Sequence, residues 1–313
     1  MKATTPTLVV TGSSGFVGEK LALVAIREGY EVIGIDLKKS RKLTCRQLEL
    51  DLASENFFDK IPKKSTIIHL ASLSTDGACR DNPLVALDAN LRATALILEN
   101  AFKSDASHFV FASSEWVYPE LSNVAAQSER NELKLTSLNS LYAMTKLFGE
   151  SLIRVESKIP QTILRFGIVY GPRFPPGSAV ESIAWKIHLN EEVKIGSKNT
   201  ARRFIHVSDL LNGILKCIEI GPSPLNQKII NLSGAELVSL DKIANASNQI
   251  LNKSTQIIET GGNASIRNPV NALALELLDW KPKIDFKVGL LECLTFMIQA
   301  YEKGLSNGEN LGY

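Results

Sequence analysis

The feature that most limits how this chain can fold is a regular alternation between short apolar segments and segments with helical spacing. Mostly apolar segments that predict strands lie at residues 8–11, 31–36, 48–52, 66–71, 108–112 and 161–166. Helical spacing of apolar residues is found at 16–28, 83–102 and 142–156. Nearly continuous apolar strands that alternate with helices are typical of a parallel sheet covered on both faces. The sequence therefore predicts the α/β class, with a doubly wound parallel sheet.

This regular pattern weakens after the loop at 173–178, whose sequence RFPPGS is the clearest break in composition. The less regular remainder suits a smaller C-terminal α/β domain. We expect a first domain over 1–167, with 203–232 returning to it, and a second domain over 168–202 and 233–313. The polar end of the chain after Gly304 is expected to fray.

Composition excludes several other classes of protein. With 313 residues, 44% of them hydrophobic, and a formal net charge of +2, the chain is ordinary for a globular protein and suggests neither nucleic-acid nor membrane binding. Residues 1–10 lack the apolar core of a signal peptide. The cysteines are far apart, which argues against disulfides and a cysteine-based metal site and favours a cytoplasmic setting. They are Cys45, Cys79, Cys217 and Cys293.

A glycine-rich turn joins the first predicted strand to the first helix. Gly12, Gly15 and Gly18 are spaced GxxGxxG, a variant of the dinucleotide fingerprint. Gly12 allows the tight turn, Gly15 admits a pyrophosphate to the backbone, and Gly18 lets the helix pack closely on the sheet. The free N–H groups of the helix then face the phosphates. A plain tight turn is the alternative, but the strand–turn–helix context favours a Rossmann-type site.

An acidic residue at the end of the second strand supports this interpretation. Asp36 lies 18 residues beyond Gly18, where a carboxylate accepts hydrogen bonds from the adenosine ribose and repels a 2′-phosphate. NAD is therefore favoured over NADP. Lys38, Lys39 and Arg41 could reach a 2′-phosphate, but we interpret them as solvated surface charges.

A second pattern, YxxxK, lies on the predicted helix 142–156. Its four-residue spacing places Tyr142 and Lys146 on one helix face, where a lysine ammonium is expected to lower the pKa of a phenol. Such a tyrosine can accept a proton from a hydroxyl group. Ser113 and Ser114 directly follow the strand at 108–112, at the sheet edge where ligands bind. Read alone, the tyrosine and lysine fit an amphipathic helix, and the serines fit a turn.

Together these segments resemble an extended short-chain dehydrogenase/reductase of the NAD-dependent epimerase/dehydratase family, whose members mostly act on nucleotide sugars. The resemblance runs from residue 8 to about residue 295. It rests on motifs found in the expected order: TGSSGFVG at 11–18, Asp51-Leu52, HLAS at 69–72, Asn90, SSEWVY at 113–118, YAMTK at 142–146, LRFGIVYGP at 164–172, RRFIHVSDL at 202–210 and LLDWKP at 277–282.

The resemblance implies a role for each matching residue. The glycines are implied to hold the pyrophosphate, and Asp36 to bind the adenosine ribose. Asp51 and Leu52 are implied to flank the adenine. Ala71 is implied to lie near the nicotinamide, and Asn90 to support the site. Residues expected to line the cofactor are Gly12, Ser14, Gly15, Phe16, Val17, Gly18, Asp36, Asp51, Leu52, Leu70, Ala71, Ser72, Asn90, Tyr142 and Lys146. The implied catalytic residues are Ser114, Tyr142 and Lys146. Those implied to bind substrate are Ser114, Glu115, Trp116 and Arg202, the last gripping a diphosphate. The mechanism implied needs no metal.

Departures from the family pattern concern the substrate. Ile168 stands where many relatives have an asparagine, and Arg203 where they often have an aspartate. Residues 260–263, Thr-Gly-Gly-Asn, replace an arginine-led segment, although Arg267 lies nearby. Sugar 4,6-dehydratases have two acids where this chain has Glu115-Trp116, which argues against that reaction. Glu115 is then either a second acid or base or a polar residue at the rim, and we favour the rim position.

We therefore predict an NAD-dependent nucleotide-sugar epimerase of the 4-epimerase type, which acts by transient hydride transfer to tightly bound NAD. A reductase, dehydrogenase, dehydratase or decarboxylase that acts on a sugar or a small carbonyl compound remains an alternative. A non-catalytic dinucleotide-binding scaffold is another. The resemblance also implies a homodimer built from helices at about 83–102 and 142–157, although their apolar residues fit core packing equally well. His69 and His206 are predicted to be structural.

Overall fold

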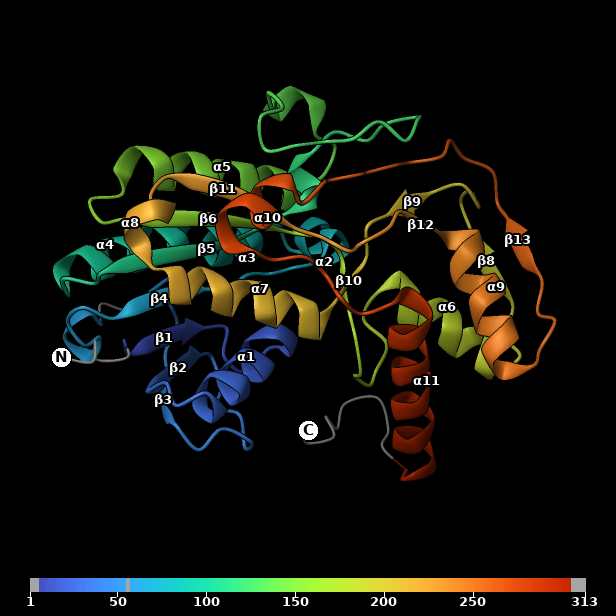
Figure 1. The fold of residues 1–313 in the computed structure, drawn as a ribbon, viewed down its shortest axis with the longest axis horizontal. Helices are drawn as coiled ribbons and strands as arrows, with labels where there is room; N and C mark the ends of the chain where they lie inside the picture. Colours follow the sequence, from blue (N-terminus) through green and yellow to red (C-terminus); the bar gives the residue numbers. More distant parts are fainter. Residues whose placement is uncertain (1–5, 55–56, 305–313) are drawn as a thin grey trace.

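A seven-stranded parallel sheet forms the centre of the protein in the computed structural model, which describes residues 6–54 and 57–304 (Figure 1). The strand order is β11-β6-β5-β4-β1-β2-β3, and every neighbouring pair is parallel. The strands are β1 Leu8–Thr11, β2 Val32–Asp36, β3 Arg46–Glu49, β4 Thr66–His69, β5 His108–Ser114, β6 Gln161–Phe166 and β11 Lys228–Leu232. The predicted doubly wound sheet is confirmed.

Helices cover both faces of this sheet. Strands such as β1 and β5 are therefore buried along their whole length. On one face, α1 (Phe16–Arg27), α7 (Val207–Ile220) and α10 (Ala272–Leu278) share a core with β1 and β11. On the other, α4 (Ala93–Lys103) and α5 (Leu141–Glu156) pack against β4 and β5. Figure 1 shows the sheet between these two layers.

A second, smaller body lies beside the carboxyl end of the sheet. Its core joins the helices α6, α9 and α11. Their bounds are Ala179–His188, Leu240–Leu251 and Phe286–Glu302. Short strand pairs extend it, with β8 (Val193–Ile195) on β13 (Ile257–Glu259) and β9 (Ala201–Arg202) on β12 (Val238–Ser239). The pair β7 (Val169–Tyr170) and β10 (Ile205–His206) lies where the chain passes between the bodies. The cis peptide bond Phe174-Pro175 falls in the predicted loop.

Three segments differ from the sequence-based expectation. The third strand ends at Glu49, so residues 50–52 follow it instead of forming it. The predicted helix 83–102 consists of α3 (Pro83–Leu87), a π-helical turn (Asp88–Arg92) and α4. The segment of α10 was expected in the second domain, yet Ala274, Leu278 and Trp280 pack in the core around α7. The remaining short helices are α2 (Asp76–Asp81) and α8 (Pro222–Leu225).

Two expectations concern other parts of the chain. The tail predicted to fray, 305–313, lies outside the described residues, and the roles assigned to the two domains stay a prediction. Among the residues that are described, none of the helices combines the length and apolar character needed to cross a bilayer.

The glycine turn is held by backbone contacts that leave no room for a side chain. Gly12 has a φ of +69°, and a Cβ there would lie 2.8 Å from the backbone nitrogen of Ala71. A Cβ at Gly18 would lie 2.1 Å from the Gly12 carbonyl oxygen. Both glycines are therefore required for α1 to begin directly beneath the turn.

We predict that Gly18→Ala destabilises the protein, since the backbone of the turn must move to admit the methyl group. Overpacking of this kind costs about 1–3 kcal/mol. The measurement is the free energy of unfolding from urea titration. Gly77→Ala is the control, because that helical glycine has nothing within 4 Å of the added Cβ. A Gly18 variant as stable as the Gly77 variant would contradict the prediction.

Candidate active site

The glycine turn forms a binding surface for an anionic group at the start of α1. Gly15 precedes the helix, and no side chain caps it, so the N–H groups of Phe16 and Val17 are not used by a cap. A Cβ at Gly15 would meet only the Gly12 carbonyl, at 3.3 Å, which leaves the outer side of the turn open. These features fit the pyrophosphate of a dinucleotide.

Asp36 lies at the end of β2 with its carboxylate turned toward the glycine turn. Its Oδ2 accepts a hydrogen bond from the Ser14 N–H at 2.9 Å, and its Oδ1 accepts one from the Leu37 N–H at 2.7 Å. Lys38 and Lys39 are exposed, in agreement with solvated charges. A carboxylate fixed at this position suits a ribose with free hydroxyls, and so fits NAD better than NADP.

The remaining predicted cofactor residues lie at the same edge of the sheet. Leu70, Ala71 and Ser72 form the partly exposed loop after β4, where the Leu70 and Ala71 N–H groups donate to Thr11 Oγ1. Asp51 is exposed after β3, whereas Leu52 is buried in the core under β2, so its contact with an adenine stays a prediction.

Asn90 supports this edge from the π-helical turn. It is buried, and its Oδ1 accepts a hydrogen bond from the Leu73 N–H at 2.7 Å. Its Nδ2 donates to the Leu73 carbonyl and to Thr145 Oγ1. Asn90 therefore ties the loop after β4 to α5, a positioning role that agrees with the expectation.

The predicted catalytic residues meet between β5 and α5. Lys146 is buried, donates from Nζ to the Ala112 carbonyl at 2.8 Å, and lies 5.8 Å from the Tyr142 ring centroid. Ser114 also acts on Tyr142 through a side-chain hydrogen bond. Ser113 instead donates to Glu150, which pairs with Arg165 in the core. The structure thus assigns Ser114 to the site and Ser113 to packing.

One expectation about this group needs correction. The sequence predicted that Lys146 lowers the pKa of Tyr142. Burial instead raises the pKa of the phenol to about 12, and the hydrogen bond from Ser114 opposes that rise only in part. Burial likewise lowers the pKa of Lys146 to about 8. Within the chain alone, desolvation by burial is the largest cause of both shifts.

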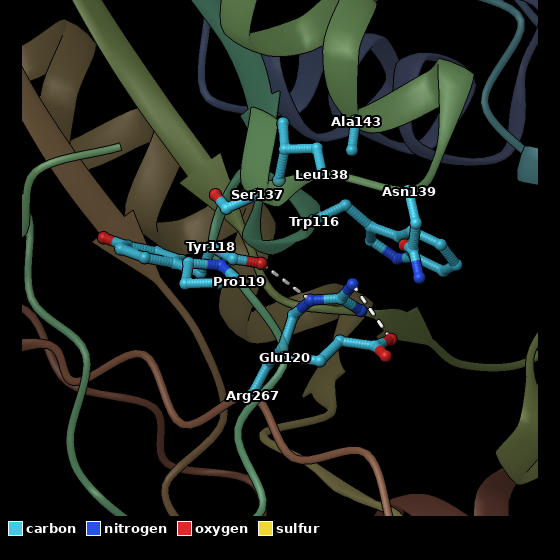
Figure 2. A pocket seen from close by; sticks show the side chains of 9 residues that line it. All are labelled: Trp116, Tyr118, Pro119, Glu120, Ser137, Leu138, Asn139, Ala143 and Arg267. Carbon is cyan, nitrogen blue, oxygen red and sulfur yellow. Dashed lines mark hydrogen bonds and ion pairs between the residues drawn. The ribbon is translucent and has the colours of Figure 1, made fainter. Parts of the chain in front are cut away.

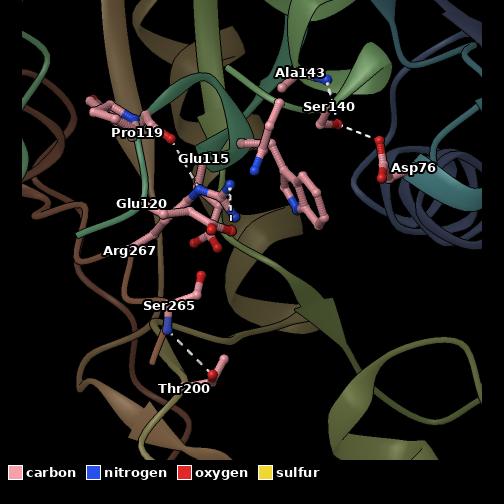
Figure 3. Close-up of polar contacts among 12 residues, drawn as sticks. Asp76, Glu115, Pro119, Glu120, Ser140, Ala143, Thr200, Ser265 and Arg267 are labelled. Carbon is pink, nitrogen blue, oxygen red and sulfur yellow. Dashed lines mark hydrogen bonds and ion pairs between the residues drawn. The ribbon is translucent and has the colours of Figure 1, made fainter. Parts of the chain in front are cut away.

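Two of the residues predicted to bind substrate, Glu115 and Arg202, lie in a cluster of four charges beside Tyr142. The cluster, which we call the charge cluster, consists of Glu115, Glu120, Arg202 and Arg267. Arg202 Nε lies 3.5 Å from Glu115 Oε1 and its Nη2 lies 3.5 Å from Glu120 Oε1. Arg267 Nη2 lies 3.1 Å from the same Glu120 oxygen. Figure 3 shows Glu115, Glu120 and Arg267 gathered together, with Ser265 close by.

Backbone pairing explains how Arg267 reaches this place. Ile266 exchanges hydrogen bonds with Leu121, and the Arg267 N–H donates to the Ala201 carbonyl. The side chain then donates from Nε to the Tyr118 carbonyl at 3.0 Å and stacks over the Trp116 ring. The sequence noted Arg267 only as a nearby residue, and Glu120 was missed, since no local motif marks either of them.

A cavity of about 230 Å³ opens beside the charge cluster (Figure 2). Its walls come from the segment after β5, the start of α5 and Arg267. The lining residues are Trp116, Tyr118, Pro119, Glu120, Ser137, Leu138, Asn139, Ala143 and Arg267. The Trp116 ring stands edge-on to Tyr142, with 6.1 Å between centroids, so the cavity adjoins the catalytic residues.

Glu115 is not the rim residue that the sequence favoured. Its side chain is fully buried, and burial raises its pKa to about 7 against the opposing effects of Arg202 and Arg267. Both carboxylate oxygens lack a normal hydrogen bond within the described part of the chain. His69 bonds Thr11 and Thr94, and His206 packs against Tyr170, contacts that fit the predicted structural roles.

Comparison with known proteins agrees with this geometry. Residues 8–233 match the NAD dependent epimerase/dehydratase family, and the chain belongs to that family. This confirms the predicted enzyme class and its NAD cofactor. The UDP-glucuronate 4-epimerase of Thermodesulfobacterium geofontis is 26% identical over 311 residues, covering 90% of this chain and 93% of that protein.

Solved structures share the fold across nearly the whole chain. MoeE5 in complex with UDP-glucuronic acid and NAD superimposes with a TM-score of 0.84 at 23% identity, covering 94% of this chain and 99% of that chain. The UDP-glucose 4-epimerase of Thermotoga maritima, with UDP-glucose, gives 0.81 at 22% identity, covering 96% of this chain and 100% of that one.

We predict that ionisation of Glu115 destabilises the folded protein. Because its pKa rises from 4.5 to about 7 on folding, stability decreases as the pH rises through this window, by on the order of 3 kcal/mol. Glu115→Gln removes this loss, so the variant gains stability relative to the parent as the pH rises from 4.5 to 7. Thermal unfolding across this range measures the effect.

Glu132→Gln is the matched control, since the Glu132 side chain is 81% exposed. It should follow the parent protein at every pH. An unchanged pH slope in Glu115→Gln would show that this carboxylate is not the buried titrating group.

Proposed function

We propose that this protein is an NAD-dependent nucleotide-sugar 4-epimerase that acts on a UDP-linked sugar. The observation that carries the proposal is the meeting of Ser114, Tyr142 and Lys146 beside the open glycine turn. The names of the relatives support it, since they include a UDP-glucuronate 4-epimerase and a UDP-glucose 4-epimerase.

The glycine turn and Asp36 would hold the pyrophosphate and the adenosine ribose, with the loop at 70–72 beneath the nicotinamide end. When bound, NAD accepts a hydride from the sugar C4 carbon and returns it. Tyr142 Oη, as phenolate, takes the proton from the C4 hydroxyl, so that the oxygen forms a carbonyl with C4. Ser114 hydrogen-bonds the same oxygen and holds it against Tyr142.

Epimerisation would follow if the keto sugar rotates in the site and presents the opposite face of C4 to the cofactor before it is reduced again. Tyr142 then returns its proton to the oxygen, and no net redox change remains. Lys146, held by the Ala112 carbonyl, contributes a positive charge on the same helix face as the phenol. This charge favours the phenolate, which burial alone disfavours.

Arg202 and Arg267 are our candidates for binding the diphosphate of the substrate. Both are largely buried, and their guanidinium groups meet at Glu120, whose side chain is 38% exposed. A diphosphate can replace this carboxylate between the two arginines, because Glu120 can turn to solvent. Arg267 would thereby substitute for the family arginine that residues 260–263 lack.

Dehydration is less well supported than epimerisation. That reaction uses two acidic residues after the catalytic hydroxyl residue, and this chain has one, Glu115, followed by Trp116. The Trp116 ring packs against Tyr142 and Arg267, and its indole has no group that gains or loses a proton near neutral pH.

We predict that Tyr142→Phe lowers epimerase kcat by about 10²–10⁴-fold, because the phenol oxygen is the proton acceptor. NAD content and melting temperature should stay close to those of the parent. The assay is conversion of a UDP-sugar to its 4-epimer, followed by NMR. Tyr301→Phe is the control, since Tyr301 is an exposed residue of α11. Full activity in Tyr142→Phe would refute the proposed mechanism.

We also propose a homodimer, formed by α3 and α5 packing against the same helices of a second copy. These helices carry exposed apolar side chains: Leu84, Val85, Phe148 and Val155. A group of exposed apolar side chains on adjacent helices is more typical of a protein–protein interface than of a solvent-exposed surface. A cytoplasmic location stays a prediction from cysteine usage.

We predict that Phe148→Glu converts the dimer to a monomer, because a charge cannot be buried unpaired in an apolar interface. Light scattering after size exclusion should report a mass near 34.3 kDa for the variant, against twice that for the parent. Leu291→Glu, an equally exposed position on α11, should leave the dimer intact. A parent protein that is monomeric at all concentrations would overturn the dimer proposal.

A further inference from the structure

The charge cluster contains buried polar atoms that make no normal hydrogen bond within residues 6–54 and 57–304, although Glu115 and Arg202 face each other as an ion pair. Glu115 Oε1 and Oε2, Arg202 Nε and Arg267 Nη1 are inaccessible to solvent and make no normal hydrogen bond with the described residues. Buried polar groups in folded proteins are almost always hydrogen-bonded. Arg267 and Glu120 line the cavity, and Arg202 and Glu115 join them through close ion pairs. This arrangement indicates where the polar groups of a ligand bind.

Glu115 is the member of this group nearest to the reaction. It follows Ser114 directly in the chain, and its negative charge contributes to the raised pKa of Tyr142. The backbone N–H of Ile168 acts on the Glu115 carboxylate from the other side. The Ile168 side chain is apolar and offers no hydrogen-bonding group beside Glu115.

The charges of the cluster are balanced without a ligand. Two arginines, Arg202 and Arg267, face two glutamates, Glu115 and Glu120. Glu120 is partly exposed and can leave when a diphosphate arrives, but Glu115 is enclosed and remains. The carboxylate of a uronic acid placed against Glu115 would be a second buried negative charge. It would find no free positive charge there, because Arg202 and Arg267 would already bind Glu115 and the diphosphate. Like charges brought together in this way are strongly unfavourable.

We propose that Glu115 determines which sugar the site accepts: it receives hydrogen bonds from a hydroxyl or amino substituent and excludes a sugar that carries a carboxylate. The inference rests on the proposed function and adds the substrate class to it. It separates this chain from relatives whose names include UDP-glucuronate. The substrate would be a UDP-linked neutral hexose or aminohexose.

The test compares UDP-glucose with UDP-glucuronic acid on the NAD-loaded protein. We expect kcat/KM to favour UDP-glucose by about tenfold or more, and calorimetric binding to show the same preference. Equal use of the two substrates, or a preference for the uronic acid, would overturn the inference while leaving the epimerase proposal intact. If neither is epimerised, the binding preference still tests the inference. Failure of both to bind would refute the two proposals together.

Two substitutions separate recognition from structural support. Glu115→Gln and Glu115→Ser remove the charge. The ratio of kcat/KM for UDP-glucose to that for UDP-glucuronic acid should then fall about tenfold or more, mainly because kcat/KM for the uronic acid rises. Glu120→Gln is the matched control, because it removes a carboxylate from the same arginines at the diphosphate end. It should change kcat/KM for both substrates alike and keep their ratio. An unchanged ratio in folded Glu115 variants would show that Glu115 is merely structural.

The pH dependence provides a readout that a structural role would not produce. Glu115 faces Arg202 on β9, Arg267 on the segment after β13, and Tyr142 on α5. As the pH falls below about 7, Glu115 gains a proton, and relative use of the uronic acid should rise. The ratio should not vary with pH in Glu115→Gln. A parent ratio that is constant between pH 5 and 8 would count against the proposal.

Discussion

The parallel direction of all seven strands is the constraint on which the site depends. Because every carboxyl end lies at one edge, the turn after β1, the loop after β4 and Ser114 at the end of β5 share a single crevice. The strand order reverses between β1 and β4, and there the Gly12 backbone lies against Ala71. α5 then carries Tyr142 and Lys146 to the same edge. Binding surface and catalytic groups follow from one topological feature.

Burial disfavours the charged forms of side chains at two places in this crevice. At Tyr142 and Lys146 it disfavours both charged forms, so the pair is suited to exchanging a proton only when further charge stabilises the phenolate. In the charge cluster, the attraction between Glu115 and the arginines opposes the cost of burial only in part. Removing one partner from such a cluster is costly, which makes these positions sensitive to the charge of the ligand.

Local spacing was sufficient to predict much of the site. The glycine turn, Asp36 and the YxxxK pair each lie within one strand, turn or helix, where short-range geometry decides which groups meet. The errors concern quantities that depend on distant packing. The pKa of Tyr142 depends on how completely the cavity encloses it, and the burial of Glu115 depends on the second body. α10 was misplaced because its apolar face fits either core.

The sequence by itself determined the α/β class and predicted the glycine turn and the Tyr142–Lys146 pair, because these depend on periodicity and on spacings of a few residues. Ser114 was predicted from the resemblance of its motif to the family. Only the tertiary structure decided which charges face the substrate. Arg267 lies far along the chain from Tyr118, Glu120 and Ala201, and backbone pairing of the segment 265–267 brings it to them. Contacts between such distant segments leave no local pattern, since they arise when separately formed elements pack together.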